Sequence, residues 1–381
     1  APRRGPRVES MSYTADTLQL LAPDGQRVAS DATEQYLPYV DALGDDQLRE
    51  FHRVMSVMRR FDIEAGNLQR QGQLALWVPS IGQEAAQAGS GFAAKAQDHL
   101  FPAYREHTVG YIRGLDPVRI IAMLRGQTHG GWVPEETGNF HLYTLVIGSQ
   151  ALHATGYAMG VAFDGKVGTG DPDVDTAVMV YFGDGATSQG DVNEAYVFAQ
   201  SYQTPQVFFL QNNHWAISVP VRVQSRTPLY LRPRGFGIES VQIDGNDVLA
   251  SYAVTAANLD AARSGAGPRF IEALTYRIGA HTTSDDPSKY RDEEQFRYWQ
   301  ERDPISRFET YLRAQGEGDA FFASVAEEAE DVAADARART LALEPPAAAS
   351  MFAHVYSEAH PVMDAQREWL AQYEASFEGE A

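Results

Sequence analysis

The sequence contains no cysteine, which excludes disulfides, thiolate nucleophiles and zinc or iron–sulfur sites with cysteine ligands. It also has no apolar run near the roughly 20 residues that a membrane-spanning helix needs. No apolar stretch follows the basic residues of the opening APRRGPRVES, so we expect no signal peptide. Lysine is scarce, with three lysines against 28 arginines, a bias typical of a GC-rich bacterial genome.

Positive charge is outweighed by negative charge, with 31 Lys and Arg against 51 Asp and Glu and a formal net charge of −20. This surplus argues against a nucleic-acid partner or an anionic membrane surface. The 381 residues, 44% of them hydrophobic, are enough to bury a substantial core. We therefore expect a soluble, cytoplasmic bacterial protein with no nucleic-acid or membrane partner.

Three short apolar runs predict buried strands at Val178–Phe182, Val207–Leu210 and Phe270–Leu274. Because they alternate with helical patterns, they predict an α/β fold in which helices flank a doubly wound parallel sheet. The small residues at Gln83–Ala94 and Ala151–Val161 predict tightly packed helices, either buried within this chain or against another subunit.

The composition divides the chain into three regions. Residues 1–44 predict an N-terminal arm with turn signals such as Pro23-Asp24-Gly25, residues 45–318 the α/β domain, and residues 319–381 a helical C-terminal tail. Asp45 or Asp46 is expected to cap the first domain helix, which carries Phe51, Met55 and Met58 on its buried face.

An acidic residue stands where one predicted strand gives way to a helix. Gly183-Asp184-Gly185 follows the first apolar run, Ser188-x-x-Asp191 resembles a capping box, and the next strand ends in Asn212-Asn213. Parallel strands end at one edge of a sheet, so Asp184 and Asn213 are expected there together, where ligands bind in such folds. Carboxylate and amide oxygens suit Mg²⁺, and glycines let backbone approach a phosphate. The alternative is a pair of ordinary turns.

Gly183-Asp184-Gly185, followed 26 residues later by Asn212-Asn213, looks like the thiamine diphosphate-binding motif. More widely, the chain resembles the α subunit of the E1 component of 2-oxo acid dehydrogenase complexes. The resemblance spans roughly residues 45 to 315 and rests on these stretches: NLQRQG (67–72), GQEA (82–85), YRE (104–106), GDGATSQG (183–190), QNNHWAIS (211–218), VQIDGND (241–247), TYRIGAH (275–281) and SDDPSKYR (284–291).

The resemblance implies a thiamine diphosphate-binding fold and assigns roles to individual residues. Mg²⁺ would be bound by Asp184, the Asn213 side chain and the Trp215 carbonyl. The residues implied to contact thiamine diphosphate are Tyr104, Arg105, Ser149, Ala151, Gly183, Asp184, Gly185, Ala186, Gln211, Asn213 and His281. Gln211 departs from relatives that carry arginine there, so no diphosphate salt bridge is expected from it.

His281 is the implied catalytic group, since a donor near the cofactor can stabilise negative charge that develops during reaction. The alternative for a lone loop histidine is a solvated or locally bonded side chain. His129 and His141 are secondary candidates, with no role assigned. Thr282 stands where mitochondrial relatives carry a phosphorylated serine, with Ser284 further on, which argues against kinase control of this loop.

The implied reaction is oxidative decarboxylation of a 2-oxo acid with reductive acylation of the lipoyl group on E2. TYRIGAHTTSDDPSKYR, IDGNDV and DPISR resemble the branched-chain enzymes, with pyruvate and acetoin enzymes as alternatives. A Mg²⁺-dependent phosphohydrolase and a non-catalytic scaffold are alternatives of other classes. The chain has room for only the diphosphate half of the site, so the resemblance implies an E1 β subunit in an α₂β₂ heterotetramer and a lipoylated E2 acyltransferase as partners.

Overall fold

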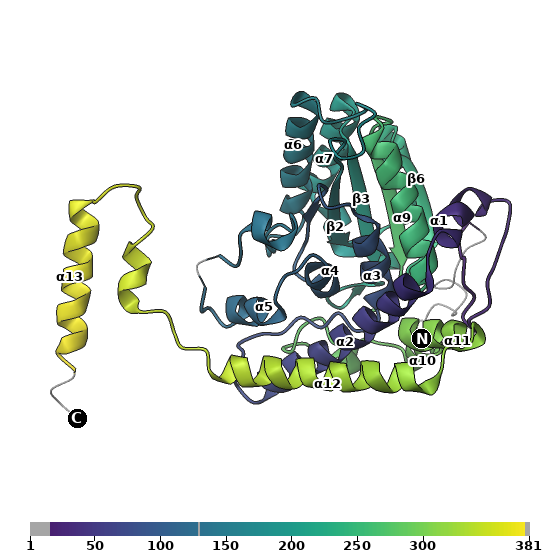
Figure 1. Ribbon diagram of the computed structural model, residues 1–381. Coiled ribbons are helices and arrows are strands. Elements are labelled where there is room, and N and C mark those ends of the chain that lie inside the picture. Colours follow the sequence, from purple (N-terminus) through teal and green to yellow (C-terminus); the bar gives the residue numbers. More distant parts are fainter. Residues whose placement is uncertain (1–15, 129, 378–381) are drawn as a thin grey trace, which may run out of the picture.

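The computed structural model describes residues 16–128 and 130–377, and its centre is a parallel sheet in the strand order β1-β2-β3-β7-β6 (Figure 1). The strands are β1 (His99–Phe101), β2 (Val178–Gly183), β3 (Gln206–Asn212), β6 (Glu239–Asp244) and β7 (Arg269–Leu274). Every neighbouring pair in this sheet runs parallel, and the three predicted strands are confirmed.

Helices cover both faces of the sheet. They are α3 (Glu84–Ala93) and α9 (Val248–Arg263) on one face and α6 (Ser149–Phe163) and α7 (Gly190–Tyr202) on the other. In β2, Met179 and Tyr181 pack toward α3 and α9, whereas Val178, Val180 and Phe182 pack toward α6 and α7. Successive strand residues point to opposite faces, so a strand covered on both sides needs an unbroken apolar run. The predicted doubly wound α/β class is therefore confirmed.

The two small-residue helices differ in what surrounds them. A Cβ on Gly89 of α3 would lie 2.5 Å from the Cβ of Ser251 in α9, so this helix is packed closely within the chain. Gly156 and Gly160 of α6, by contrast, have nothing within 4 Å of a built Cβ. Of the two alternatives, burial within the chain holds for α3, while α6 leaves a face of small residues open.

The first domain helix, α2 (Asp45–Arg70), begins where it was expected but is capped differently. Gly44 is the N-cap, and its backbone N–H donates to Oε1 of Gln47 at 3.1 Å. The prediction that Asp45 or Asp46 caps this helix is therefore wrong, because both lie inside the first turn. The buried face with Phe51, Met55 and Met58 is confirmed.

The described part of the predicted N-terminal arm packs on the α/β domain. Leu18 bridges Ile243 of β6 in parallel, and the N–H groups of Leu20 and Leu21 donate to Oδ2 of Asp247. The predicted turn at residues 23–25 is present, with the Gly25 N–H donating to the Ala22 carbonyl at 2.9 Å. Residues 16–44 are thus joined to the sheet edge.

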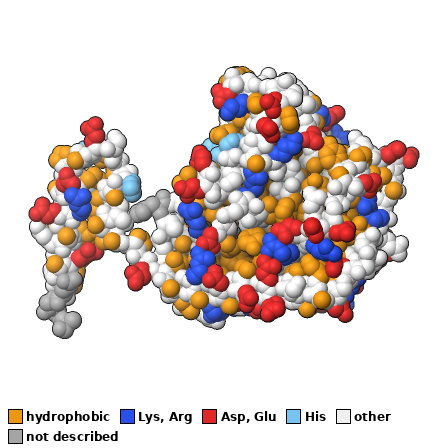
Figure 2. Space-filling view, in the orientation of Figure 1, with side chains coloured by type: hydrophobic (Ala, Val, Ile, Leu, Met, Phe, Trp, Pro, Cys, Tyr) orange, Lys and Arg blue, Asp and Glu red, His pale blue; other side chains and the backbone are white. Residues whose placement is uncertain are grey.

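The C-terminal region is helical, as predicted. α12 (Asp319–Leu341) lies along α2, whereas α13 (Pro361–Ala375) stands apart from the body of the protein (Figure 1). Hydrophobic side chains, including the exposed Trp369 and Tyr373, gather on this separate part (Figure 2). No described helix combines the length and apolar character needed to cross a membrane.

The remaining elements are short segments, connecting helices and one small hairpin. They are η2 (Glu34–Tyr36), α1 (Leu37–Asp41), α4 (His107–Ile112), α5 (Pro117–Leu124), η3 (Pro134–Thr137), η4 (Asp184–Ser188), β4 (Trp215–Ala216), β5 (Val219–Pro220), α8 (Val221–Gln224), η5 (Leu229–Leu231), η6 (Pro233–Phe236), η7 (Pro287–Lys289), α10 (Glu293–Gln300), α11 (Pro304–Ala314) and η8 (Ala348–Phe352).

Candidate active site

The acidic turn after β2 forms η4, a short 3₁₀ segment that begins at Asp184. The predicted capping box at Ser188 is wrong, because α7 begins at Gly190 with Gln189 as N-cap and no side-chain cap. Ser188 is instead the last residue of η4. The parallel register pairs Gly183 of β2 with Gln211 of β3, so Asp184 and Asn213 leave the same edge of the sheet, as predicted.

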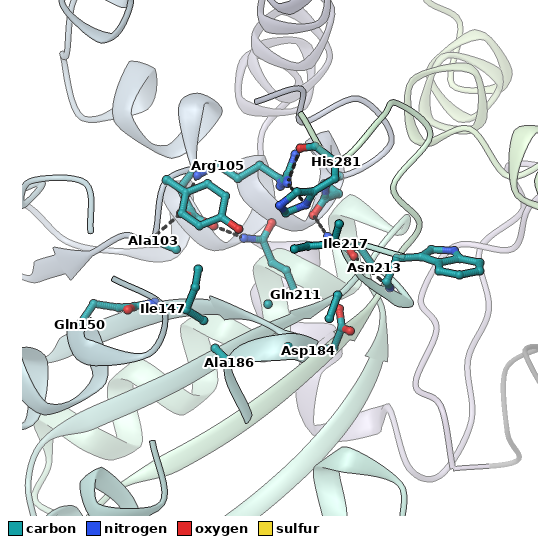
Figure 3. A pocket seen from close by; sticks show the side chains of 17 residues that line it. Ala103, Arg105, Ile147, Gln150, Asp184, Ala186, Gln211, Asn213, Ile217 and His281 are labelled. Atoms are coloured by element: carbon teal, nitrogen blue, oxygen red, sulfur yellow. Dashed lines mark hydrogen bonds between the residues drawn. The ribbon is translucent and has the colours of Figure 1, made fainter. Parts of the chain in front are cut away.

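These strand ends open into a cavity of about 300 Å³, seen from close by in Figure 3. In that view Arg105 and His281 lie on one side, Asp184 and Ala186 on the other, and Gln211 between them. The residues that line the cavity are Gln83, Ala103, Tyr104, Arg105, Glu106, Ile147, Gln150, Gly183, Asp184, Gly185, Ala186, Gln211, Asn213, Trp215, Ala216, Ile217 and His281.

Asp184 is a buried carboxylate, 1% exposed, with one strong donor beside it. Nε2 of Gln224 donates to its Oδ2 at 2.6 Å. Burial raises the pKa of Asp184 to about 6, and the Gln224 hydrogen bond and the charge of Arg277 offset this only in part. Burying a carboxylate is costly unless it is paired, so a cation in the cavity would stabilise its charged form.

The cavity does not contain a cluster of acids. Within the described chain, no group of three or more His, Asp or Glu side chains could hold a metal ion. A cation at Asp184 would therefore rely on neutral oxygens, such as the Asn213 amide and backbone carbonyls, and on oxygens of a ligand. This donor set matches Mg²⁺ bound to a phosphate better than a resident metal held by protein alone.

Two buried arginines beside His281 make this side of the site positively charged. Arg105 donates through Nη2 to the His281 carbonyl at 3.0 Å, and Arg277 donates to the Ile217 carbonyl and the Tyr290 hydroxyl, each at 2.7 Å. The carbonyl and hydroxyl partners are neutral, and the Asp285 carboxylate, 3.9 Å from Arg277 Nη2, offsets part of the charge of Arg277. The remaining positive charge favours an anion in the cavity.

The same arginines set the protonation of His281. Arg105 Nη2 and Arg277 Nη1 each lie 3.3 Å from His281 Nδ1, and guanidinium groups only donate. Nδ1 is therefore the acceptor, and the proton of the neutral ring is on Nε2. Burial lowers the pKa of His281 to about 4, with further lowering by the charges of Arg105 and Arg277. At neutral pH the ring is an uncharged donor.

Several buried polar atoms around the cavity lack a partner. Among the described residues, no hydrogen bond is made by Gln83 Nε2, Gln150 Oε1, Gln211 Oε1 or Trp215 Nε1. The orientation of Gln211 is fixed, because its Nε2 donates to Glu106 at 2.6 Å. Buried polar atoms are normally hydrogen-bonded, so this set indicates that a polar ligand fills the space.

The structure brings most of the predicted site residues together. Tyr104, Arg105, Gly183, Asp184, Gly185, Ala186, Gln211, Asn213, Trp215 and His281 all line the cavity. Ser149 and Ala151 do not line it. Ser149 donates to the Val146 carbonyl at 2.9 Å and Ala151, in the first turn of α6, is buried in the core, while the adjacent Ile147 and Gln150 line the cavity.

The secondary histidine candidates do not add to this site within the described residues. His141 is 3.2 Å from His99 through their ring nitrogens and stacks on Phe101, away from the residues that line the cavity. His129 lies outside the described residues. Thr282 and Ser284 are in the loop after His281, and the Thr282 hydroxyl accepts from the Ser284 N–H at 3.3 Å.

Sequence reasoning assigned no role to four polar residues of this site. Gln83 and Glu106 are in the quoted stretches GQEA and YRE, and Arg277 in TYRIGAH, so the resemblance could have drawn attention to them. Gln224 lies at the end of α8, in a stretch where the sequence predicted no element and no site. Its contact with Asp184, 40 positions away, depends on the tertiary fold.

The model of the dehydrogenase E1 component family matches residues 52–339 of this chain. The chain belongs to the dehydrogenase E1 component family. It is 41% identical over 369 residues to the 3-methyl-2-oxobutanoate dehydrogenase subunit alpha of Mycobacterium tuberculosis, and the match covers 96% of each chain. Membership in this dehydrogenase E1 family implies thiamine diphosphate as the cofactor.

Two further dehydrogenase E1 relatives carry another name. The chain is 36% identical over 312 residues to the pyruvate dehydrogenase E1 component subunit alpha of Bacillus cereus, over 81% of this chain and 80% of the relative. It is 39% identical over 293 residues to the protein of that name from Acholeplasma laidlawii, over 76% and 80%. Family membership argues against the phosphohydrolase alternative.

Proposed function

We propose that this chain is the α subunit of a branched-chain 2-oxo acid dehydrogenase E1 component, which decarboxylates its substrate and acylates the lipoyl group of E2. The observation that carries the proposal is the cavity itself. In a dehydrogenase E1 chain, it combines the poorly paired carboxylate of Asp184 with the buried cation Arg105, while Arg277 lies 3.3 Å from the lining residue His281. A magnesium diphosphate has the complementary charges.

The residues around Asp184 fit the cation and diphosphate of thiamine diphosphate. Asp184 and Asn213 would bind Mg²⁺ together with the Trp215 carbonyl, which now accepts from Arg277 Nη1 at 3.3 Å and has a second lone pair. Gly183, with nothing within 4 Å of a built Cβ, would leave room for the diphosphate at the turn. Bound there, thiamine diphosphate supplies the electron sink for loss of CO₂ from a 2-oxo acid.

The chain's own residues bind and orient. Arg105, whose guanidinium is held by the carbonyls of Pro79 and His281, would place its charge beside the diphosphate. His281 holds a proton on Nε2 and would donate it as a hydrogen bond to negative charge developing on the substrate. Because its ring stays neutral at pH 7, it can do so without carrying a charge of its own.

The preference for branched-chain substrates is supported by the share of this chain that each named relative matches and by apolar residues at the cavity. The relative named for 3-methyl-2-oxobutanoate matches 96% of this chain, and the pyruvate-named relative from Bacillus cereus 81%. Ile147 and Ile217 line the cavity and are 39% and 55% exposed, so they offer apolar surface to a substrate or partner. Pyruvate is the second candidate.

We propose an E1 β subunit and a lipoylated E2 as partners, with two α and two β chains. The relatives are named as alpha subunits, which implies a second kind of chain. The open small-residue face of α6, with Gly156 and Gly160, and the exposed Tyr157 beside it support a subunit contact. A cytoplasmic location is expected for such a complex.

Co-expression with an E1 β subunit tests this proposal. The reconstituted enzyme should require thiamine diphosphate and Mg²⁺, and should turn over 3-methyl-2-oxobutanoate with at least tenfold higher kcat/KM than pyruvate, since a site separates such homologues about 10–200-fold. Preference for pyruvate would contradict the substrate. Robust turnover by the pure α chain, measured with an artificial electron acceptor, would contradict the need for β.

A further inference from the structure

The segment from His214 to Gln224 forms a hairpin and a short helix beside the acidic turn. β4 pairs with β5 in antiparallel fashion, and α8 follows directly. His214 and Ile217 adopt positive φ angles of 71° and 55°. Such angles are unfavourable for residues with side chains, so surrounding contacts must hold this hairpin in its conformation.

Two contacts fix the backbone of the hairpin. A Cβ on Gly185 would lie 2.8 Å from the Cβ of Ala216, so the hairpin packs against a position where only glycine fits without a shift. The Arg277 guanidinium donates to the carbonyls of Trp215 at 3.3 Å and Ile217 at 2.7 Å. Both contacts bring the hairpin to the cavity.

Gln224 makes a third contact of a different kind. Its Nε2 donates to the Val219 carbonyl inside the hairpin segment at 3.1 Å and to Oδ2 of Asp184 across the cavity edge at 2.6 Å. An amide NH₂ group has two hydrogens, so both are used. One side chain therefore joins the hairpin to the carboxylate.

We infer that Gln224 is a positioning residue for the cation at Asp184, an inference that rests on the proposed function. With Oδ2 held by the amide, Oδ1 is the oxygen left for the cation. The same amide holds the hairpin that carries the Trp215 carbonyl, so one side chain positions two of the three proposed oxygen ligands. Cation binding and hairpin order are thus coupled, and each stabilises the other.

The test uses the full-length chain with Mn²⁺ and inorganic pyrophosphate as probes. Bound Mn²⁺ is measured by electron paramagnetic resonance, and hydrogen exchange is followed in peptides that cover residues 214–227. Gln224→Met keeps the side-chain length and removes the donor, while Val223→Ala, exposed on the same short helix, is the matched control. Asp184→Asn removes the charged ligand, and thermal unfolding checks that each variant is folded.

We expect Gln224→Met to bind Mn²⁺ about tenfold more weakly, the ratio for one lost charge-assisted hydrogen bond of ~1.4 kcal/mol. It should also lose the protection that Mn²⁺ and pyrophosphate confer on residues 214–224. Val223→Ala should behave as wild type.

Two results would overturn the inference, and they differ in meaning. If Asp184→Asn loses Mn²⁺ while Gln224→Met keeps wild-type affinity and protection, Gln224 has no positioning role and the cation site stands. If wild type fails to bind Mn²⁺, or Asp184→Asn binds it equally well, the cation site of the proposed function is wrong and the role of Gln224 falls with it.

Discussion

Two buried carboxylates, Asp62 and Asp184, differ in the number of hydrogen-bond donors that the chain provides for them. Asp62 of α2 accepts from Trp77 Nε1 at 2.5 Å, from the Ser80 N–H at 2.6 Å and from the Ser80 hydroxyl at 2.9 Å. Asp184, just as buried, accepts from the side chain of Gln224. Burial raises the pKa of both, but several hydrogen bonds counter it at Asp62.

The difference separates structural charge from charge that awaits a ligand. Around Asp62 the chain supplies its own donors, which tie α2 to the loop at residues 77–80. Around Asp184 the chain supplies few, and a cavity of about 300 Å³ lies beside it. A buried acid that the fold leaves under-satisfied next to a cavity is a better guide to function than burial alone.

The largest loss of activity is expected for Asp184→Ala in the reconstituted enzyme. We expect kcat/KM to fall by more than about 10³-fold, because the variant loses the charged ligand of the cation. Stability should change little, since a poorly paired buried charge contributes little to folding. Steady-state kinetics and thermal unfolding measure both. Asn213→Ala should act in the same direction, and near-normal turnover in either variant would refute the metal assignment.

Asp62→Ala should have the converse effect, on stability rather than chemistry. It leaves three donors on Trp77 and Ser80 unpaired in a buried region, which should lower the free energy of unfolding by about 3–5 kcal/mol. Urea unfolding measures the loss. The exposed Asp46→Ala is the control and should change stability by less than about 0.5 kcal/mol. Equal midpoints of urea unfolding for the two variants would show that Asp62 does not stabilise the fold.

His281→Ala should reduce kcat by about 10²–10³-fold, the usual cost of one oriented donor to developing charge. The fold should be retained, because the ring is only partly buried. His107→Ala sharpens the contrast. That ring is buried, bonded to Val78 and Tyr143 and stacked on Trp77, so its loss should lower stability instead. If His281→Ala turns over within twofold of wild type at saturating cofactor, His281 has no catalytic role.

The smallest expected effect is the pH dependence of cation binding. The pKa of Asp184 is raised from 3.8 to about 6, so the folded chain holds this proton over a range where the unfolded chain has released it. The stability of the ligand-free chain at this site therefore falls as pH rises from about 4 to 6. Cation and proton compete, so Mn²⁺ affinity should be constant above pH 6 and fall about tenfold per unit below it.

Mn²⁺ titrations from pH 5 to 8 check this dependence, and the Asp184→Asn variant supplies the comparison for stability. An affinity that stays flat down to pH 5 would mean that the carboxylate does not bind the cation or is already ionised there.

The sequence was most informative where topology fixes position. Strands at 178–182 and 207–210 had to be parallel if a helix crossed between them, so Asp184 and Asn213 could be placed at one edge before any coordinates. The local helix caps were predicted wrongly at Asp45 and Ser188. Several side chains near a helix start can cap it, and the choice depends on backbone angles within one or two residues.

The hydrogen-bond partners of buried polar groups could not be predicted from the sequence. The sequence singles out Asp184 by its place after a strand, but it does not show that three donors surround Asp62, because these donors and Gln224 are brought to the carboxylates by the tertiary fold. The placement of Gln83 and Gln150 at the cavity has the same origin. Glutamine has no periodic signature, and its role is set by the contact that its amide finds.

Residues 20–22 bind to residues that come much later in the sequence, which has a consequence for synthesis on the ribosome. The Leu20 and Leu21 N–H groups need Asp247, and the carbonyls of Leu21 and Ala22 accept from Arg307. Asp247 emerges 227 residues after Leu20, a delay of about 11–45 s at translation rates of about 5–20 residues per second. Until then, the N–H groups of the leucine pair lack the carboxylate that binds them in the folded chain.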